Sequence, residues 1–244
     1  MKHIWLACLL LLMTILTACA TEIQSDPDNN GGATRKCDTG GVIVGWVDFL
    51  KINDFTYERF SRIGNEGPAL KGNKIGEVTF MLADCAPPDH ISQNGDAAFL
   101  EAGTPIYEVK GYPAELMVEA AGKLYIVDRN EEAKSVVDLY PIKGKVKDLH
   151  LQSSEDGSRV HTFTKKNKKA FLDDFFKQEL IDQSALRRNG GTDGPMDFIE
   201  IELENGAYIR LVYWKDSNAF SVARSNDRIA AIIEEEKSRA AGKE

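Results

Sequence analysis

Cysteine is scarce in this chain of 244 residues, which holds only Cys8, Cys19, Cys37 and Cys85. Their number and spacing exclude a Cys-x-x-Cys redox pair and a four-cysteine zinc site. No His-Glu-x-x-His motif, phosphate-binding Gly-x-x-x-x-Gly-Lys loop, Gly-x-Gly-x-x-Gly loop or Gly-x-Ser-x-Gly elbow occurs in the sequence. The sequence thus predicts no particular catalytic residue, metal ligand or cofactor.

Positive charge is also in short supply. Lys and Arg number 30 against 38 Asp and Glu, which gives a formal net charge of −8. Nucleic acid is therefore not an expected partner, because its binding depends on clustered cations that neutralise phosphates. The densest basic cluster is Lys165, Lys166, Lys168 and Lys169, at the start of a predicted helix. It is interpreted as a solvated helix end partly offset by nearby acids, with contact to anionic lipid or wall phosphate as the alternative.

Long apolar runs are absent as well. The longest, from Ile4 to Leu16, is shorter than the roughly 20 residues of a membrane-spanning helix. It follows Lys2 and ends in Leu16-Thr17-Ala18-Cys19, the pattern of a cleaved secretory signal with a cysteine just after the cut. We expect a lipoprotein signal peptide over residues 1–18 and a lipid on Cys19 that holds the protein on a membrane, outside the cytoplasm. The alternative is an uncleaved anchor.

Residues 19–37 form the lipidated cysteine and a polar segment with Pro, Gly and one large apolar residue, Ile23. Such a composition is typical of a flexible tether. Cys37 at its end and Cys85 are the cysteines that remain beyond the leader and Cys19, and in an exported protein such a pair favours a disulfide. Two buried thiols that never meet are the alternative.

Residues 38–142 are predicted to form a β-rich domain. Short runs rich in Val, Ile, Phe and Tyr are separated by Gly, Pro, Asn and Asp, and no helical period is present. Ala121-Gly122 predicts a tight hairpin. Several short strands of this kind favour a small barrel or sandwich. The expected strands cover 42–49, 54–60, 77–83, 105–111, 115–121 and 123–129.

Residues 143–244 are predicted to form an α+β domain, an antiparallel sheet with two helices, in which a strand-turn-strand-helix unit occurs twice. The first unit has strands 146–152 and 158–164 and an amphipathic helix over 167–183. The second has strands within 198–214 and a final helix capped by Ser225 or Asn226. The fold class expected for the whole chain is α+β.

Side-chain parity in the second hairpin determines its turn. Ile199, Ile201 and Leu203 alternate with acidic residues along the first strand. A two-residue turn would place apolar side chains beside acidic ones, whereas the three-residue loop 204–206 keeps the rows apart and sets Glu200 opposite Arg210. We therefore predict a three-residue loop with Gly206 at positive φ.

Histidines are the remaining candidates for chemistry. His150 and His161 lie on the two strands of the first C-terminal hairpin, where they could be neighbours with Asp148 as a third metal ligand. A pair of solvent-facing strand residues is the favoured interpretation. His90 follows Cys85 in a Pro-rich loop, with Asp84 and Asp89 nearby in sequence, but no nucleophile accompanies it.

Three stretches carry a family resemblance: Ile75–Phe80, Gly95–Tyr112 and Leu124–Asn130. In these the chain resembles uncharacterised lipoproteins of Gram-positive spore-forming bacteria. The resemblance covers the middle of the chain and implies a lipid-anchored envelope protein. It brings no catalytic residues.

The sequence predicts an anchor, a spacer and two β-rich units, and it offers no ordered set of nucleophile and base. This organisation favours a non-enzymatic binding or interaction module of the cell envelope. The acidic balance suggests a protein or cationic partner in the envelope. The alternative function is an envelope hydrolase that acts on wall or carbohydrate through paired carboxylates.

Overall fold

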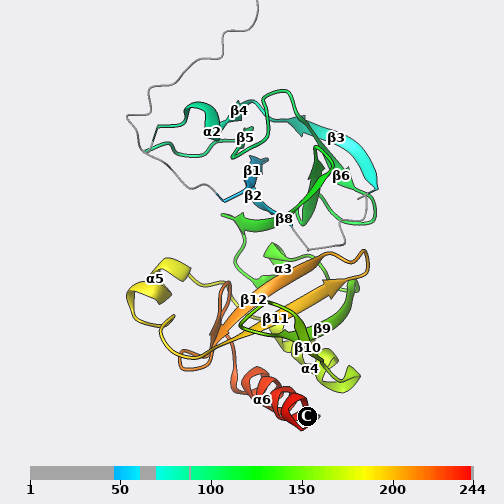
Figure 1. The fold of residues 1–244 in the computed structure, drawn as a ribbon, viewed down its shortest axis with the longest axis vertical. Helices are drawn as coiled ribbons and strands as arrows, with labels where there is room; N and C mark the ends of the chain where they lie inside the picture. The colour runs from blue at the N-terminus through cyan, green and yellow to red at the C-terminus, as the bar shows by residue number, and fades with distance from the viewer. Residues whose placement is uncertain (1–46, 61–69, 88, 243–244) are drawn as a thin grey trace, which may run out of the picture. The chain divides into compact units, whose positions relative to one another are not determined.

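The computed structural model describes residues 47–60, 70–87 and 89–242. The predicted signal peptide, Cys19, the tether and Cys37 lie outside the described residues, so the lipid and the Cys37–Cys85 bridge stay predictions. Within the described ranges no helix is both long and apolar enough to cross a membrane. The chain has a mixed α+β fold with two separate sheets, as the sequence predicts at this level (Figure 1).

The first sheet has eight strands in the order β3-β6-β7-β8-β2-β1-β5-β4, and it is curled (Figure 1). Neighbouring strands are antiparallel except for β4 and β5, which are parallel. The short helix α2 (Leu82–Cys85) follows β4, and α3 (Val136–Leu139) follows the sheet. The strands are β1 (Phe49–Ile52), β2 (Phe55–Arg59), β3 (Lys71–Glu77), β4 (Phe80–Met81), β5 (Asp96–Ala97), β6 (Pro105–Val109), β7 (Met117–Ala120) and β8 (Lys123–Asn130).

Two details of this sheet test the sequence prediction. Ala121 and Gly122 join β7 to β8 with φ of 52° and 77°, as a tight hairpin turn requires, so the predicted hairpin is confirmed. The predicted strand 77–83 is wrong, because the chain changes partners along it. Val78 N donates to Thr104 O at 2.9 Å, whereas Thr79 N donates to Gly95 O at 2.7 Å.

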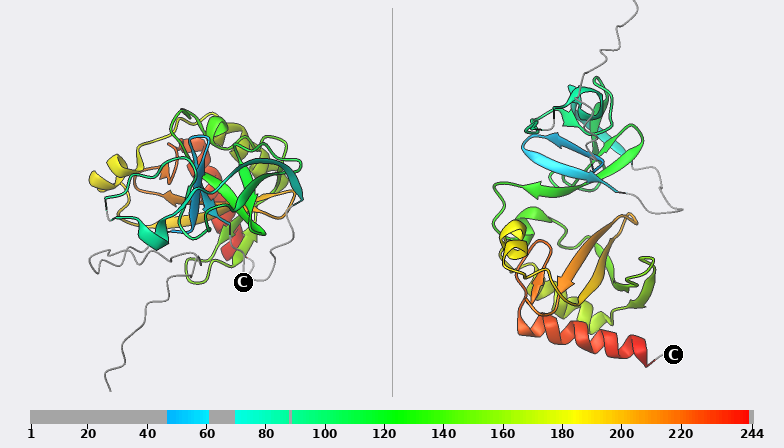
Figure 2. Two further views of the ribbon diagram at one scale, coloured as in Figure 1. Left: turned by 90° about the horizontal axis from the view of Figure 1, so that it is seen from above. Right: turned by 60° about the vertical axis from the view of Figure 1, so that its left-hand side comes forward.

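The second sheet is antiparallel, with the strand order β10-β9-β11-β12-β13. Helices α4 and α6 cover one of its faces (Figures 1 and 2). Phe171 and Phe175 of α4 and Ile229 and Ile233 of α6 are fully buried there. The elements are β9 (Val146–Gln152), β10 (Arg159–Thr162), α4 (Lys165–Phe175), α5 (Gln183–Arg188), β11 (Met196–Leu203), β12 (Tyr208–Trp214), β13 (Ala219–Phe220) and α6 (Asp227–Ala241).

The β11–β12 hairpin has the predicted register. Glu200 lies opposite Arg210 and Ile201 opposite Ile209. Leu203 N donates to Ala207 O at 2.8 Å across the loop, and Gly206 has φ of 83°. The three-residue loop and the left-handed Gly206 are both confirmed.

The predicted helix 167–183 ends too late. Helix α4 runs from Lys165 to Phe175, and the chain then becomes extended. Leu180 N donates to Lys134 O at 2.9 Å and Ile181 N donates to Val222 O at 3.1 Å. These bonds to distant segments replace the hydrogen bonds that a longer helix would have made. They also place residues 179–184 along an open groove.

Candidate functional site

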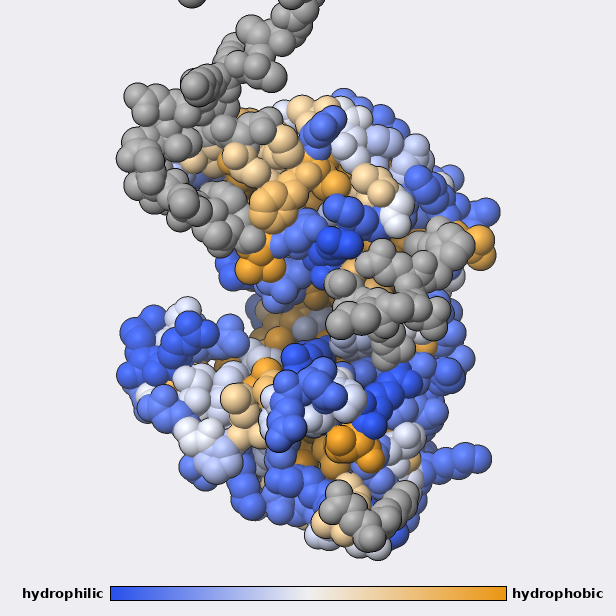
Figure 3. All heavy atoms as spheres, in the orientation of Figure 1, coloured by the Kyte–Doolittle hydropathy of each residue, from blue (hydrophilic) through white to orange (hydrophobic). Residues whose placement is uncertain are grey.

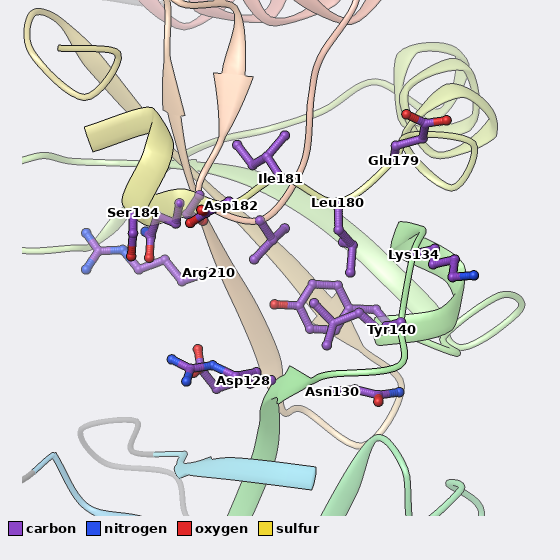
Figure 4. A pocket seen from close by; sticks show the side chains of 16 residues that line it. Asp128, Asn130, Lys134, Tyr140, Glu179, Leu180, Ile181, Asp182, Ser184 and Arg210 are labelled. Carbon is purple, nitrogen blue, oxygen red and sulfur yellow. The ribbon is translucent and has the colours of Figure 1, made fainter. Parts of the chain in front are cut away.

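An open groove of about 880 Å³ lies between the end of β8, the residues around α3, and segment 179–184. A hollow bordered by α5 is visible at the left of Figure 3, with hydrophobic surface at its floor. Figure 4 shows its side chains from close by. The volume is in the range of sites that hold small ligands. Three residues matter most for its chemistry: Asp128, Tyr140 and Arg210.

Asp128 reaches the groove through a β-bulge. Between β2 and β8, Thr56 pairs with Arg129 and Tyr57 pairs with Val127, which leaves Asp128 without an opposite residue. An extra residue of this kind interrupts the ladder and redirects a side chain, and bulges are frequent beside functional sites. The bulge explains why an acidic residue next to the buried Ile126 and Val127 lines the groove rather than the sheet core.

A second hollow, of about 270 Å³, adjoins the groove and shares Asp128, Tyr140 and Arg210 with it. Glu58 of β2 and Tyr208 of β12 line this second hollow. The three shared residues therefore stand where the two hollows meet, and they come from β8, the end of α3 and β12.

Tyr140 is 5% exposed, yet its hydroxyl makes no hydrogen bond to any described residue. Figure 4 shows the hydroxyl pointing into the groove. Burial raises the pKa of Tyr140, and the nearby carboxylates of Asp128 and Glu58 raise it further. The side chain therefore stays a neutral phenol that can donate one hydrogen bond and accept others.

Glu58 and Asp128 line the second hollow with Tyr140, near enough for the carboxylate charge of Asp128 to act on Glu58. Burial raises the pKa of Glu58, Asp128 raises it further, and Arg129 lowers it. Burial also raises the pKa of Asp128, against the effect of Arg129. Both residues are exposed to solvent where they line the second hollow, so solvent weakens the effect of burial on them. Two acids in this setting favour a bound cation or a shared proton.

Arg210 supplies positive charge on the opposite side of the site. Its guanidinium lies 4.1 Å above the centre of the Phe198 ring, and no described carboxylate forms an ion pair with it. Its cross-strand neighbour Glu200 instead accepts hydrogen bonds from Arg159 Nε at 2.9 Å and Gln152 Nε2 at 2.6 Å. The ring holds the planar cation while leaving its donors open to a ligand.

The groove also has an apolar part. Leu139, Leu180, Ile181 and Val222 line it, and all four are buried or half-buried. Leu180 approaches the Tyr140 ring in Figure 4. The main-chain bonds from Leu180 and Ile181 to Lys134 and Val222 hold this wall in place. A ligand would therefore meet charges of both signs and an aliphatic wall in the same groove.

The histidines that the sequence singled out do not form one site. Across the β9–β10 ladder His150 pairs with Thr162 and His161 pairs with Leu151, so the two rings lie on opposite faces of the sheet. Both are buried rather than solvent-facing, at 5% and 6% exposure. The expectation of two neighbouring surface histidines is therefore wrong.

Each of these histidines instead contacts a carboxylate. His150 Nε2 lies 2.9 Å from Glu202 Oε2, and His161 Nε2 lies 2.6 Å from Glu236 Oε2 on α6. Asp148, the third ligand considered, forms an ion pair with Lys168 at 2.9 Å. No group of three potential metal ligands occurs in the described part of the chain.

The other predicted features are distributed elsewhere. Cys85 ends α2. His90 Nε2 lies 2.7 Å from Asp96 Oδ2. Within the lysine cluster, Lys169 pairs with Asp173 at 2.6 Å and Lys168 pairs with Asp148, which agrees with a partly offset helix end.

Sequence reasoning missed the three residues that define the groove. One signal was present for Asp128: Tyr125, Ile126 and Val127 are three consecutive large apolar residues, which breaks the strict alternation of a half-buried strand and indicates a bulge. Tyr140 and Arg210 gave no comparable signal, because their positions depend on contacts between distant segments.

Comparison with known proteins identifies no relative. No protein-family model matches the chain, and neither a curated protein nor a solved structure is significantly similar to it. The resemblance to Gram-positive lipoproteins stays a prediction, and function has to be inferred from the leader sequence and the groove.

Proposed function

We propose that this protein is a lipid-anchored, extracytoplasmic binding module of the cell envelope, and that the groove at Asp128, Tyr140 and Arg210 holds its ligand. The observation that carries the binding proposal is Tyr140, whose side chain is buried while its hydroxyl faces the open groove (Figure 4) and has no hydrogen-bond partner among the described residues. A hydroxyl in this position can exchange its contact with solvent for a hydrogen bond to a ligand, and its otherwise buried ring holds it in place.

The anchor is supported by the leader. A short apolar run and Leu16-Thr17-Ala18-Cys19 are the features of a lipoprotein signal over residues 1–18. Residues 19–37 would then act as a tether that carries a β-rich domain (38–142) and an α+β domain of two strand-turn-strand-helix units (143–244). The membrane would be contacted through the lipid on Cys19, and an envelope protein is the proposed source of the ligand.

A hydrolase is the second candidate, and the pair of Glu58 and Asp128 favours it. Each carboxylate has a raised pKa for which burial is the main cause, and the two interact. A protonated acid beside an ionised one is the arrangement that general acid–base catalysis uses. Under this alternative the same groove would bind a substrate and turn it over.

Expression of the full chain in a Gram-positive host tests the anchor. Wild-type protein is expected in the membrane fraction and to incorporate a fatty-acid analogue, whereas Cys19→Ala is expected to lose the label. Cys8→Ala is the matched control and should retain it. A wild type without label would contradict the proposal.

Incubation of the purified full chain with cell-wall material and with peptides separates the binder from the hydrolase. The binder proposal predicts saturable binding without new products. Product formation that Asp128→Asn or Glu58→Gln abolishes, while both variants stay folded, would establish the hydrolase instead.

A further inference from the structure

We infer that the groove takes a short apolar peptide with a free amino end and a free carboxyl end, the amino end at Glu58 and Asp128 and the carboxyl end at Arg210. This inference rests on the proposed function and names the class of its ligand. It is based on three features: charges of both signs at the site, a hydroxyl that faces the groove without a partner among the described residues, and an aliphatic wall.

The amino end is assigned from the two carboxylates. Glu58 and Asp128 repel one another, since Asp128 makes Glu58 harder to ionise. Arg129 offsets part of this charge, but it lies on the same strand and serves both acids. An ammonium group offers three donors, so it can be shared between two carboxylates and relieve their repulsion.

The carboxyl end is assigned from Arg210. Its guanidinium is held over Phe198 and has no ion-pair partner among the described carboxylates. The planar fork of a guanidinium matches the two oxygens of a carboxylate. Because Arg210 and Asp128 line the same groove, one ligand with a charge of each sign can contact both.

The body of the ligand is assigned from Tyr140 and the aliphatic wall. The Tyr140 hydroxyl points into the groove that Asp128 and Arg210 also line (Figure 4), where a peptide carbonyl or N–H would satisfy it. Leu180, Ile181 and Val222 offer apolar surface for side chains. A volume of about 880 Å³ is large for a single amino acid but suits a peptide of a few residues.

Calorimetry with trileucine tests the assignment, with the full chain in detergent. Four forms of the probe are used: both ends free, N-acetylated, C-amidated, and blocked at both ends. We expect the free peptide to bind, and each block to weaken binding by about tenfold, since each removes a charge-assisted contact.

Protein variants then identify which residue meets which end. Asp128→Asn should lower the affinity for the free peptide. In this variant N-acetylation should cost little further affinity, whereas C-amidation should still cost about as much as in the wild type. Arg210→Gln should also lower the affinity for the free peptide, but in this variant C-amidation should cost little further affinity and N-acetylation should keep its cost. A merely structural role for either residue would lower all four affinities alike.

Tyr140→Phe tests the hydroxyl, and Tyr57→Phe is its matched control. The Tyr57 hydroxyl donates to Ala114 O at 2.9 Å and Tyr57 does not line the groove. Tyr140→Phe should weaken trileucine binding about threefold without lowering the melting temperature, because no described bond is lost. Tyr57→Phe should lower the melting temperature and leave the affinity unchanged.

Equal affinity for free and doubly blocked trileucine would overturn the inference, as would the absence of binding by a folded chain. Neither result would bear on the lipid at Cys19, so the proposed anchoring would stand. Cleavage of trileucine with the same dependence on its ends would support the ligand class while overturning the non-enzymatic function.

Discussion

At the scale of single residues, Glu202 is the acid whose ionisation the structure controls most clearly. Lys147 Nζ donates to it at 3.1 Å, Arg159 Nη1 lies at 3.0 Å, and His150 Nε2 lies at 2.9 Å. Burial by itself would raise the pKa of Glu202, but the hydrogen bonds from His150, Lys147 and Arg159 outweigh it and lower the pKa to about 2. The ionised carboxylate therefore joins β9, β10 and β11.

The lowered pKa predicts a pH dependence of stability. Because the folded pKa of about 2 lies below the reference value of 4.5, Glu202 stabilises the fold fully above pH 4.5. This contribution is lost as the pH falls from 4.5 toward 2. Glu202→Gln should make the urea midpoint less dependent on pH in this range, with the exposed Glu155→Gln as control for the loss of one charge. A Glu202→Gln curve parallel to the wild-type curve would refute the account.

At the scale of elements, the start of α6 depends on Asn226. Its side-chain oxygen accepts a hydrogen bond from Ile229 N at 2.9 Å, whereas the hydroxyl of Ser225 is buried without a partner. Asn226→Ala should lower the free energy of unfolding by about 1 kcal/mol, the usual value of an N-cap. Ser225→Ala should be neutral or stabilising in the same urea experiment, and a loss at Ser225 instead of Asn226 would show that the cap is misassigned.

The β11–β12 loop offers a second test at this scale. Gly206 has φ of 83°, and a Cβ added there would meet open space within 4 Å. Gly206→Val should therefore cost about 1–3 kcal/mol of unfolding free energy through backbone strain alone. Gly206→Asn should cost less, because Asn tolerates the left-handed region. Equal costs for the two variants, measured by urea unfolding, would argue against strain as the cause.

Elements fixed by neighbouring residues were predictable from the sequence. The Gly206 loop follows from side-chain parity, the Ala121-Gly122 turn from its residue types, and α6 from its apolar stripe and cap. The end of α4 was not predictable, since it is decided by hydrogen bonds to Lys134 and Val222, which are distant in sequence.

The groove was missed for the same physical reason. Asp128 lines it because of the register between β2 and β8, and Tyr140 and Arg210 meet it from segments far apart in the sequence. The residue types alone gave no indication that these three side chains line one groove. The one local signal was the run of consecutive apolar residues before Asp128.

At the scale of the whole molecule, the groove depends on both sheets. Asp128 belongs to β8 of the eight-stranded sheet, and Arg210 belongs to β12 of the five-stranded sheet. Buried residues of both sheets belong to one continuous hydrophobic core, and Asn205 N donates to the hydroxyl of Tyr112 at 3.0 Å between them. A ligand that contacts both Asp128 and Arg210 should therefore stabilise the fold as a unit.

The central claim is that this groove is presented outside the cytoplasm by a lipid on Cys19. Mass spectrometry of the amino-terminal peptide of the mature protein, isolated from host membranes, tests it most directly. We expect a peptide that begins at Cys19 and carries a diacylglyceryl group. A peptide that begins at Met1, or one that begins at Cys19 with a free thiol, would contradict it.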